Sequence, residues 1–87
     1  MKKEKSIYIG EALKPLRLAT GISQEELAHR SKIDRSYMSD LETNKKSPSF
    51  ATIIKLAFGL GMATEDLVHE LGKTIDFARF FEEEPEK

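Results

Sequence analysis

Four polar residues are spaced so that a helix would bring them onto one side: Arg35, Ser36, Ser39 and Asp40. A guanidinium can donate two parallel hydrogen bonds to guanine O6 and N7, and a carboxylate can accept from the amino group of cytosine. Hydroxyl groups donate or accept at either kind of base edge. A short helix with this outer side is suited to reading base edges in a major groove.

The residues around these four predict two short helices with a joint of four to five residues between them. Ser23 and Glu26, three residues later, form the pattern of a capping box that starts the first helix. Asp34 predicts the start of the second helix by accepting from the backbone N–H of Ser36 or Tyr37. The apolar positions of the pair should face one interior: Leu27, Ala28, Ile33, Met38 and Leu41.

A helix is also expected before this pair. Apolar spacing from Ser6 to Thr20 fits a helix that Gly21 ends. Pro15 conflicts with a regular helix, because it loses a backbone hydrogen bond to the carbonyl of Glu11 at a cost of about 3 kcal/mol. The sequence therefore predicts either a late start near Glu11 or a kink.

Two further helices follow. Ser49 should cap a helix that Gly61 closes, and Thr64 should cap a short helix, Glu65 to Leu71, that Gly72 ends. The apolar stripe of the first of these helices is predicted to be Phe50, Ile53, Ile54, Ala57 and Leu60. No stretch alternates with a period of two, so the fold class is all-α: a compact five-helix domain with a short C-terminal helix or tail.

Composition limits the function classes. The chain has 87 residues, no cysteine and no apolar core of a signal peptide, which fits a soluble cytoplasmic protein of one domain. The net charge is −1, but residues 1–48 hold ten Lys/Arg against seven Asp/Glu. His29 and His69 have no spaced carboxylates to complete a metal site. We expect no enzyme activity, cofactor, metal, small-molecule ligand or membrane partner.

The chain resembles the Xre family of helix-turn-helix regulators, which includes the lambdoid phage repressors and Cro proteins. The resemblance covers about residues 10–72, and the segment from Asp34 to Glu42 is also similar to controller proteins of restriction–modification systems. It is carried by spaced positions: Leu13, Arg17, Gly21-Ile22-Ser23-Gln24-Glu25-Glu26-Leu27-Ala28, Ile33, Met38-Ser39, Leu41-Glu42, Pro48-Ser49 and Leu60-Gly61. It implies a lambda-repressor-like DNA-binding domain, with the helix-turn-helix at about 23–42 and the recognition helix at about 35–42.

The resemblance also implies roles for individual residues. Arg35, Ser36 and Ser39 would face the major groove, and Arg17 with Glu42 would form a structural pair. Tyr37 stays open between a phosphate contact, packing at the helix edge and a direct base contact. The remaining phosphate contacts implied are Gln24, Thr43, Asn44, Lys45 and Lys46.

Two residues depart from the family pattern. Lys32 stands where the family usually has glycine, and a positive φ there would cost about 1 kcal/mol. Asp40 puts an acid on the recognition side, where it repels phosphate. It could accept from a cytosine amino group, or hold Arg35 or another side chain.

The domain is predicted to lie between an N-terminal arm, residues 1–9, and a C-terminal dimerisation segment with an acidic tail, residues 73–87. The apolar tail residues either cover their own domain or pack across a two-fold axis: Ile75, Phe77, Phe80 and Phe81. We favour the second arrangement, and hence a homodimer on a near-palindromic operator in double-stranded DNA. The alternative function is an antitoxin that binds a partner toxin through this tail and autoregulates its operon.

Overall fold

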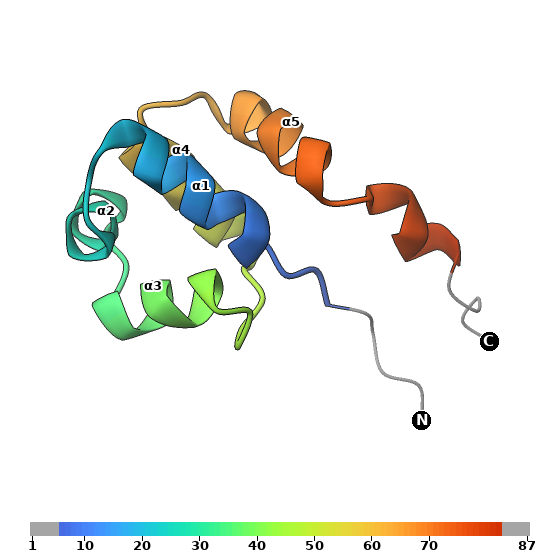
Figure 1. Ribbon diagram of the computed structural model, residues 1–87, viewed down its shortest axis with the longest axis horizontal. Helices are drawn as coiled ribbons and strands as arrows, with labels where there is room; N and C mark the ends of the chain where they lie inside the picture. Colours follow the sequence, from blue (N-terminus) through green and yellow to red (C-terminus); the bar gives the residue numbers. More distant parts are fainter. Residues whose placement is uncertain (1–5, 83–87) are drawn as a thin grey trace.

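The computed structural model describes residues 6–82, with side chains described up to Arg79. These residues form five α-helices and one 3-10 helix, and none of them lies in a strand. Figure 1 shows α5 and the 3-10 helix on the side away from α2 and α3. The elements in chain order are α1 (Gly10–Thr20), α2 (Gln24–Ser31), α3 (Arg35–Glu42), α4 (Phe50–Leu60), α5 (Thr64–Thr74) and η1 (Phe77–Glu82).

Side-chain caps and left-handed residues set most of the helix ends. Ser23 Oγ accepts from the N–H of Glu26 at 3.0 Å, and Ser49 Oγ accepts from the N–H of Thr52 at 3.1 Å. Gly21 and Gly61 end α1 and α4 with φ of 76° and 73°. These four predicted ends are confirmed.

The predicted cap at Asp34 is wrong. Asp34 does precede the first residue of α3, but its side chain makes no capping hydrogen bond. The backbone carbonyl of Asp34 instead accepts from the N–H of Met38 at 2.9 Å. The start of α3 is therefore set by the backbone, and the joint before it is three residues, 32–34, rather than four or five.

Helix α1 has the late start that Pro15 predicted. It begins at Gly10, next to Glu11, and runs through Pro15 as one helix to Thr20. Pro15 lies on the exposed side, where its ring meets solvent rather than a neighbouring helix.

The prediction for α5 is wrong at both ends. Ala63 rather than Thr64 occupies the capping position, and the helix continues through Gly72 to Thr74. Gly72 serves packing here, because a Cβ on it would lie 3.3 Å from the Phe77 ring. The helical domain therefore extends two residues past the predicted boundary.

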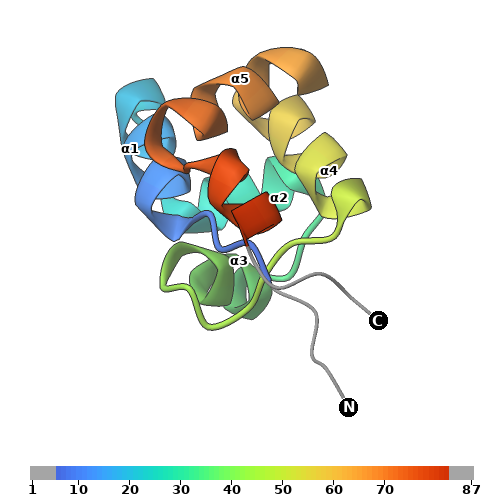
Figure 2. The same ribbon diagram turned by 90° about the vertical axis from the view of Figure 1, so that its right-hand side faces the viewer.

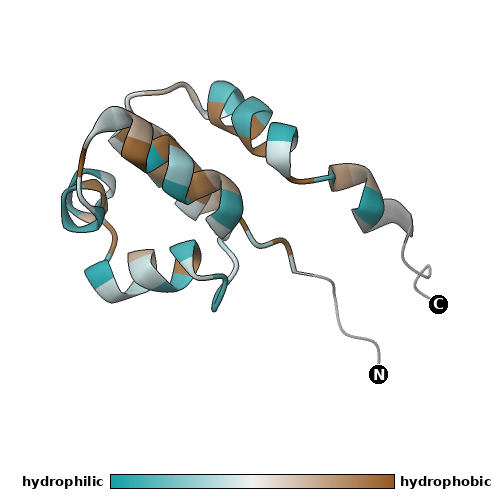
Figure 3. Cartoon of the chain, in the orientation of Figure 1, coloured by the Kyte–Doolittle hydropathy of each residue, from teal (hydrophilic) through white to brown (hydrophobic). Residues whose placement is uncertain are grey.

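One apolar core joins the five α-helices. α2 packs against α3 and α4, while α1 contacts α3, α4 and α5. Figure 3, coloured by hydropathy, shows hydrophobic residues along α1, α4 and α5. The buried apolar residues are Ile9, Ala12, Leu13, Leu27, Ala28, Met38, Leu41, Ile53, Leu56, Ala57, Leu67 and Leu71.

None of the helices in residues 6–82 is long and apolar enough to cross a membrane.

The predicted buried stripe of α4 is only partly right. Ile53 and Ala57 are buried as expected, but Leu56 belongs to the core as well. Phe50 and Ile54 are 69% and 46% exposed. The core meets a face of α4 rotated from the predicted one, and the helix has a second apolar side in solvent.

Candidate nucleic-acid interface

Helix α3 presents its predicted polar side to solvent and its apolar side to the core. Met38 and Leu41 are completely buried, so they fix which way the helix faces. Arg35 and Ser36 are exposed on the first turn, and Ser39 and Asp40 are half-buried one turn later. The structure therefore brings the four predicted base-contact residues together on one outer surface.

The joint before α3 depends on Lys32. This residue has φ 56° and ψ 47°, so it does take the left-handed conformation, the case that costs a non-glycine residue about 1 kcal/mol. Its N–H donates to the carbonyl of His29 at 3.2 Å, and the N–H of Ile33 donates to the carbonyl of Ala28 at 2.9 Å. These bonds turn the chain from α2 into α3 although the side chain disfavours the conformation.

A buried ion pair holds the far end of α3. Arg17 Nε and Nη2 donate to the two carboxylate oxygens of Glu42 at 2.6 and 3.1 Å, and the Glu42 side chain is 2% exposed. Arg17 also donates to the carbonyl of Ile22 at 3.0 Å. Hydrogen bonding to Glu42 raises the pKa of Arg17 above its ordinary value, although burial acts in the opposite direction. The pair thus ties α1 to the end of α3, as the resemblance implied.

Among the predicted phosphate-contact residues, Gln24 and Asn44 make hydrogen bonds that join separate elements. Gln24 Nε2 donates to Glu42 Oε1 at 3.1 Å, which orients its amide and leaves a second hydrogen on the same nitrogen. Asn44, in the left-handed conformation with φ 62°, accepts from the N–H of Gly10 through Oδ1 at 2.8 Å. Its amide nitrogen still carries two hydrogens, so both side chains keep a donor for phosphate.

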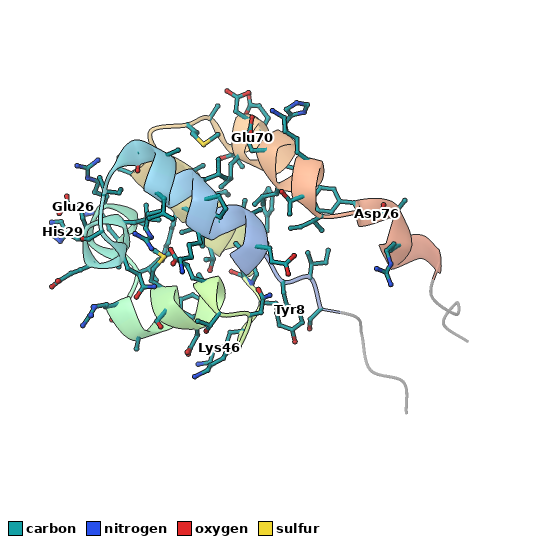
Figure 4. All side chains as sticks on the ribbon, viewed as in Figure 1. Tyr8, Glu26, His29, Lys46, Glu70 and Asp76 are labelled. Carbon is teal, nitrogen blue, oxygen red and sulfur yellow. The ribbon has the colours of Figure 1, made fainter. Side chains whose placement is uncertain are left out.

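The turn after α3 folds back onto Asp40. The N–H groups of Lys45 and Lys46 both donate to the carbonyl of Asp40, at 2.8 and 3.3 Å. Lys46 Nζ also lies 3.7 Å from Asp40 Oδ2, and Figure 4 shows Lys46 at this end of α3. Asp40 therefore holds another side chain, one of the two alternatives for this acid.

Thr43, another predicted phosphate contact, donates its only hydroxyl proton to the carbonyl of Ser39 at 2.8 Å.

Tyr37 packs at the edge of the domain. It is half-buried against the core, and its hydroxyl lies 3.4 Å from Thr52 Oγ1 in the first turn of α4. Packing at the helix edge was one of the three roles left open for Tyr37, and this contact supports it. The Tyr37 ring also has Lys46 Nζ 6.0 Å from its centroid.

The tail covers its own domain over its first residues. Ile75 and Phe77 are half-buried against the core of the same chain, which supports the first of the two arrangements for the tail, and their contact with a second copy stays a prediction. The side chains of Phe80 and Phe81 lie outside the described part of the chain, as does the acidic end of the tail. Phe77, the first residue of η1, therefore adds apolar cover to its own domain.

A model of the helix-turn-helix family matches residues 13–67, more than half of the chain. The chain belongs to the helix-turn-helix family. The match spans both helices of the motif, α2 and α3, together with most of α1 and all of α4. It agrees with the exposed polar side of α3 and identifies this protein as a helix-turn-helix DNA-binding regulator.

Two related proteins and one solved structure show which kinds of regulator the chain is similar to. The helix-turn-helix protein is 35% identical over 68 residues to control protein C.MunI of a Mycoplasma species, covering 77% of this chain and 92% of that one. It is 31% identical over 62 residues to the immunity repressor of Bacillus phage phi105, covering 71% of this chain but only 43% of the repressor. Among solved structures it is similar to the restriction–modification controller protein C.AhdI of Aeromonas hydrophila, with 41% identity, a TM-score of 0.64, and coverage of 68% and 89%. These relatives are regulators by name, and they give no support to the antitoxin alternative.

One surface was missed by sequence reasoning. Phe50, Ile54 and Phe58, which we call the α4 stripe, follow one another at intervals of four residues and are 69%, 46% and 75% exposed. A signal for it was present in the sequence, because α4 is apolar on nearly all sides. A helix of that kind has two faces that need cover.

Proposed function

We propose that this protein controls transcription by binding a near-palindromic operator as a homodimer, with α3 of each copy in the major groove. The observation that carries the proposal is the division of α3 into a buried side, Met38 and Leu41, and an outer side that begins with exposed Arg35 and Ser36. Arg35 would contact a guanine, and the other residues of the outer side, Ser36, Ser39 and Asp40, would contact adjacent bases. Gln24, Lys45 and the other polar residues of the turn would contact phosphates and fix the register.

The first experiment selects bound sequences from a random duplex library. A near-palindrome with half-sites about 34 Å apart, or a multiple of this, is the expected result. Arg35→Ala should weaken operator binding by about 1–3 kcal/mol and relax the preference at one base position per half-site. Lys73→Ala, on α5 at the opposite side of the domain from α3, is the matched control. A loss of affinity that is equal on all sequences would make Arg35 a phosphate contact instead.

Phosphate contact by the turn after α3 is tested by salt. Lys45 is exposed at this turn, and a phosphate contact through it should contribute about 0.9 to the slope of log K against log salt. Lys45→Ala should lower the slope by that amount per chain, while Lys73→Ala should leave it unchanged. An unchanged slope in both variants argues against a contact by Lys45.

We propose the α4 stripe as the main surface between two copies. Three large apolar side chains at intervals of four residues form a continuous exposed row, which single scattered surface residues do not. Figure 2 shows α4 along one side of the domain, with α3 at its base. Pairing through α4 therefore leaves the outer side of α3 uncovered in both copies. Phe80 and Phe81 stay predicted contributors to this contact.

The oligomeric state tests this surface. Replacing Phe50 and Phe58 with serine should shift sedimentation equilibrium toward monomer without changing the helical circular dichroism signal. Leu18→Ser is the matched control, because Leu18 is 58% exposed on α1 and outside the stripe. A stripe variant that stays dimeric, or a monomeric Leu18→Ser, would move the interface away from α4.

The narrower proposal is control of restriction–modification genes. It is supported by the similarity to C.MunI and C.AhdI over most of their length. The selected operator should then occur in the DNA beside such genes in the source genome. An operator found only elsewhere would leave the general regulatory function in place and reject this target.

A further inference from the structure

Asp40 binds the turn after α3 through both its backbone and its side chain. Its carbonyl accepts the N–H groups of Lys45 and Lys46, and its carboxylate lies 3.7 Å from Lys46 Nζ. The Asp40 side chain is 27% exposed and that of Lys46 is 62% exposed. The ammonium group is therefore held against α3, while most of the lysine side chain still meets solvent.

Tyr37 borders the same ammonium group. Its ring centroid is 6.0 Å from Lys46 Nζ, at the outer limit of a cation–π contact. The Tyr37 hydroxyl lies next to Thr52, which in turn lies 3.0 Å from the capping Ser49 of α4. Tyr37 is thus fixed by α4, so Lys46 Nζ lies between the Asp40 carboxylate and a tyrosine ring that is itself held in place.

A paired lysine behaves differently toward DNA from a free one. A Lys that neutralises a phosphate releases a counterion and adds to the affinity for any sequence. Lys46 paired with Asp40 carries no net charge to the phosphates, and a carboxylate left alone near them is repelled. On unrelated DNA the pair should therefore stay closed, and Lys46 should add little affinity.

A base that donates a hydrogen bond to Asp40 competes with Lys46 for the carboxylate. Cytosine N4 and adenine N6 both present amino donors in the major groove, and a lone carboxylate acceptor characteristically pairs with that of cytosine. When the cytosine amino group donates to the Asp40 carboxylate, the Lys46 ammonium group is released and can reach a phosphate. We propose that Asp40 is a specificity-determining residue that makes the phosphate contact of Lys46 conditional on the base that Asp40 meets. The inference rests on the proposed function, because it requires α3 in the major groove.

The mechanism belongs to the class in which specificity comes from a repulsive element as well as an attractive one. It also gives the two lysines of the turn different roles. Lys45 is exposed and should contact phosphate on every sequence, whereas Lys46 should do so on the operator alone. The two residues are therefore distinguishable by their salt dependence on two kinds of DNA.

The test compares the selected operator with an unrelated duplex of equal length, by fluorescence anisotropy over a range of salt. Asp40→Asn should steepen the salt slope on the unrelated duplex by about 0.9 per chain. At 0.1 M salt one such contact corresponds to a gain on the order of tenfold in affinity for that duplex, and the ratio of operator to unrelated binding should fall. Asp34→Asn removes the same charge from an exposed residue at the start of α3, and it should leave the slope unchanged.

Lys46 variants separate an effect through the lysine from a direct effect of the carboxylate. Lys46→Ala should flatten the slope on the operator and leave it unchanged on the unrelated duplex. Combining Asp40→Asn with Lys46→Ala should return the slope on the unrelated duplex to the wild-type value.

Three results would overturn the inference. The first is an Asp40→Asn variant whose salt slope on the unrelated duplex is unchanged, and the second is a Lys46→Ala variant whose slope flattens equally on both duplexes. The third is a double variant whose slope on the unrelated duplex is as steep as that of Asp40→Asn. Wild-type protein that fails to distinguish the two duplexes rejects the proposed function itself. Wild-type protein that distinguishes them while any of these three results is obtained rejects only the role of Asp40. Circular dichroism of each variant checks that α3 is still folded.

Discussion

The buried pair between Arg17 and Glu42 allows a strong prediction about stability. Arg17→Met keeps most of the side-chain volume but removes both hydrogen bonds to a carboxylate that is 2% exposed. It also leaves the carbonyl of Ile22 without its bond from the guanidinium. Removing one member of a buried pair costs about 3–5 kcal/mol, because the other charge stays in the interior without an opposite charge.

This loss is large for a chain of 87 residues, whose total stability should be about 4–13 kcal/mol. Urea unfolding followed by circular dichroism measures it. With a slope on the order of 1 kcal/mol per molar urea, the midpoint should fall by about 3–5 M, or the variant should be unfolded before urea is added. Arg30→Met, which breaks the exposed pair with Glu26, is the control and should shift the midpoint only slightly.

The double variant Arg17→Met with Glu42→Leu separates the buried charge from the lost contacts. It leaves no unpaired carboxylate, so it should recover most of the stability that Arg17→Met loses. Gln24 loses its acceptor in this variant, but its amide is half-exposed and can bond to water. A double variant no more stable than Arg17→Met, or a cost below about 1 kcal/mol for Arg17→Met, would show that charge burial does not govern this site.

Three smaller changes test other features. Lys32→Gly removes the side chain that disfavours φ 56° and should raise the free energy of unfolding by about 1 kcal/mol, measured in urea. Gly10→Ala puts a Cβ 2.6 Å from Asn44 Oδ1, so the turn must shift, and thermal stability and DNA affinity should both fall. Hydrogen bonding to Arg30 lowers the pKa of Glu26, so this carboxyl stabilises the fold above about pH 4.5, and the contribution is lost as pH falls through the lowered pKa. Glu26→Gln should accordingly flatten the acid side of a plot of stability against pH.

The limits of α3 were predictable because several local signals agree there. The spacing of Met38 and Leu41 fixed the buried side, and the predicted limits match the observed helix, Arg35–Glu42. Lys32 stands where the family usually has glycine, and it takes the left-handed conformation that glycine adopts readily. These features depend on residues close in sequence, although the capping rule failed at Asp34.

Packing across turns and against the core defeated the same reasoning. Gly72 fits the pattern of a helix end, yet it lies inside α5, at a point where a side chain would meet the Phe77 ring. In α4, apolar residues occur on nearly every side, so periodicity could not decide which side meets the core and which is exposed. The pairing of Asp40 with Lys46 depends on the turn folding back onto α3, which local patterns do not specify.

The hydrogen bond from the N–H of Gly10 to Asn44 Oδ1 makes the first turn of α1 a reporter on the turn after α3. An amide proton held only by this side chain exchanges with solvent when the turn opens, so its exchange rate measures that opening without a label. Gly10 lies 34 residues from Asn44 in the sequence and is not among the residues expected to contact DNA. Protection of this single amide by added operator would therefore record the ordering of the turn from a position behind the interface.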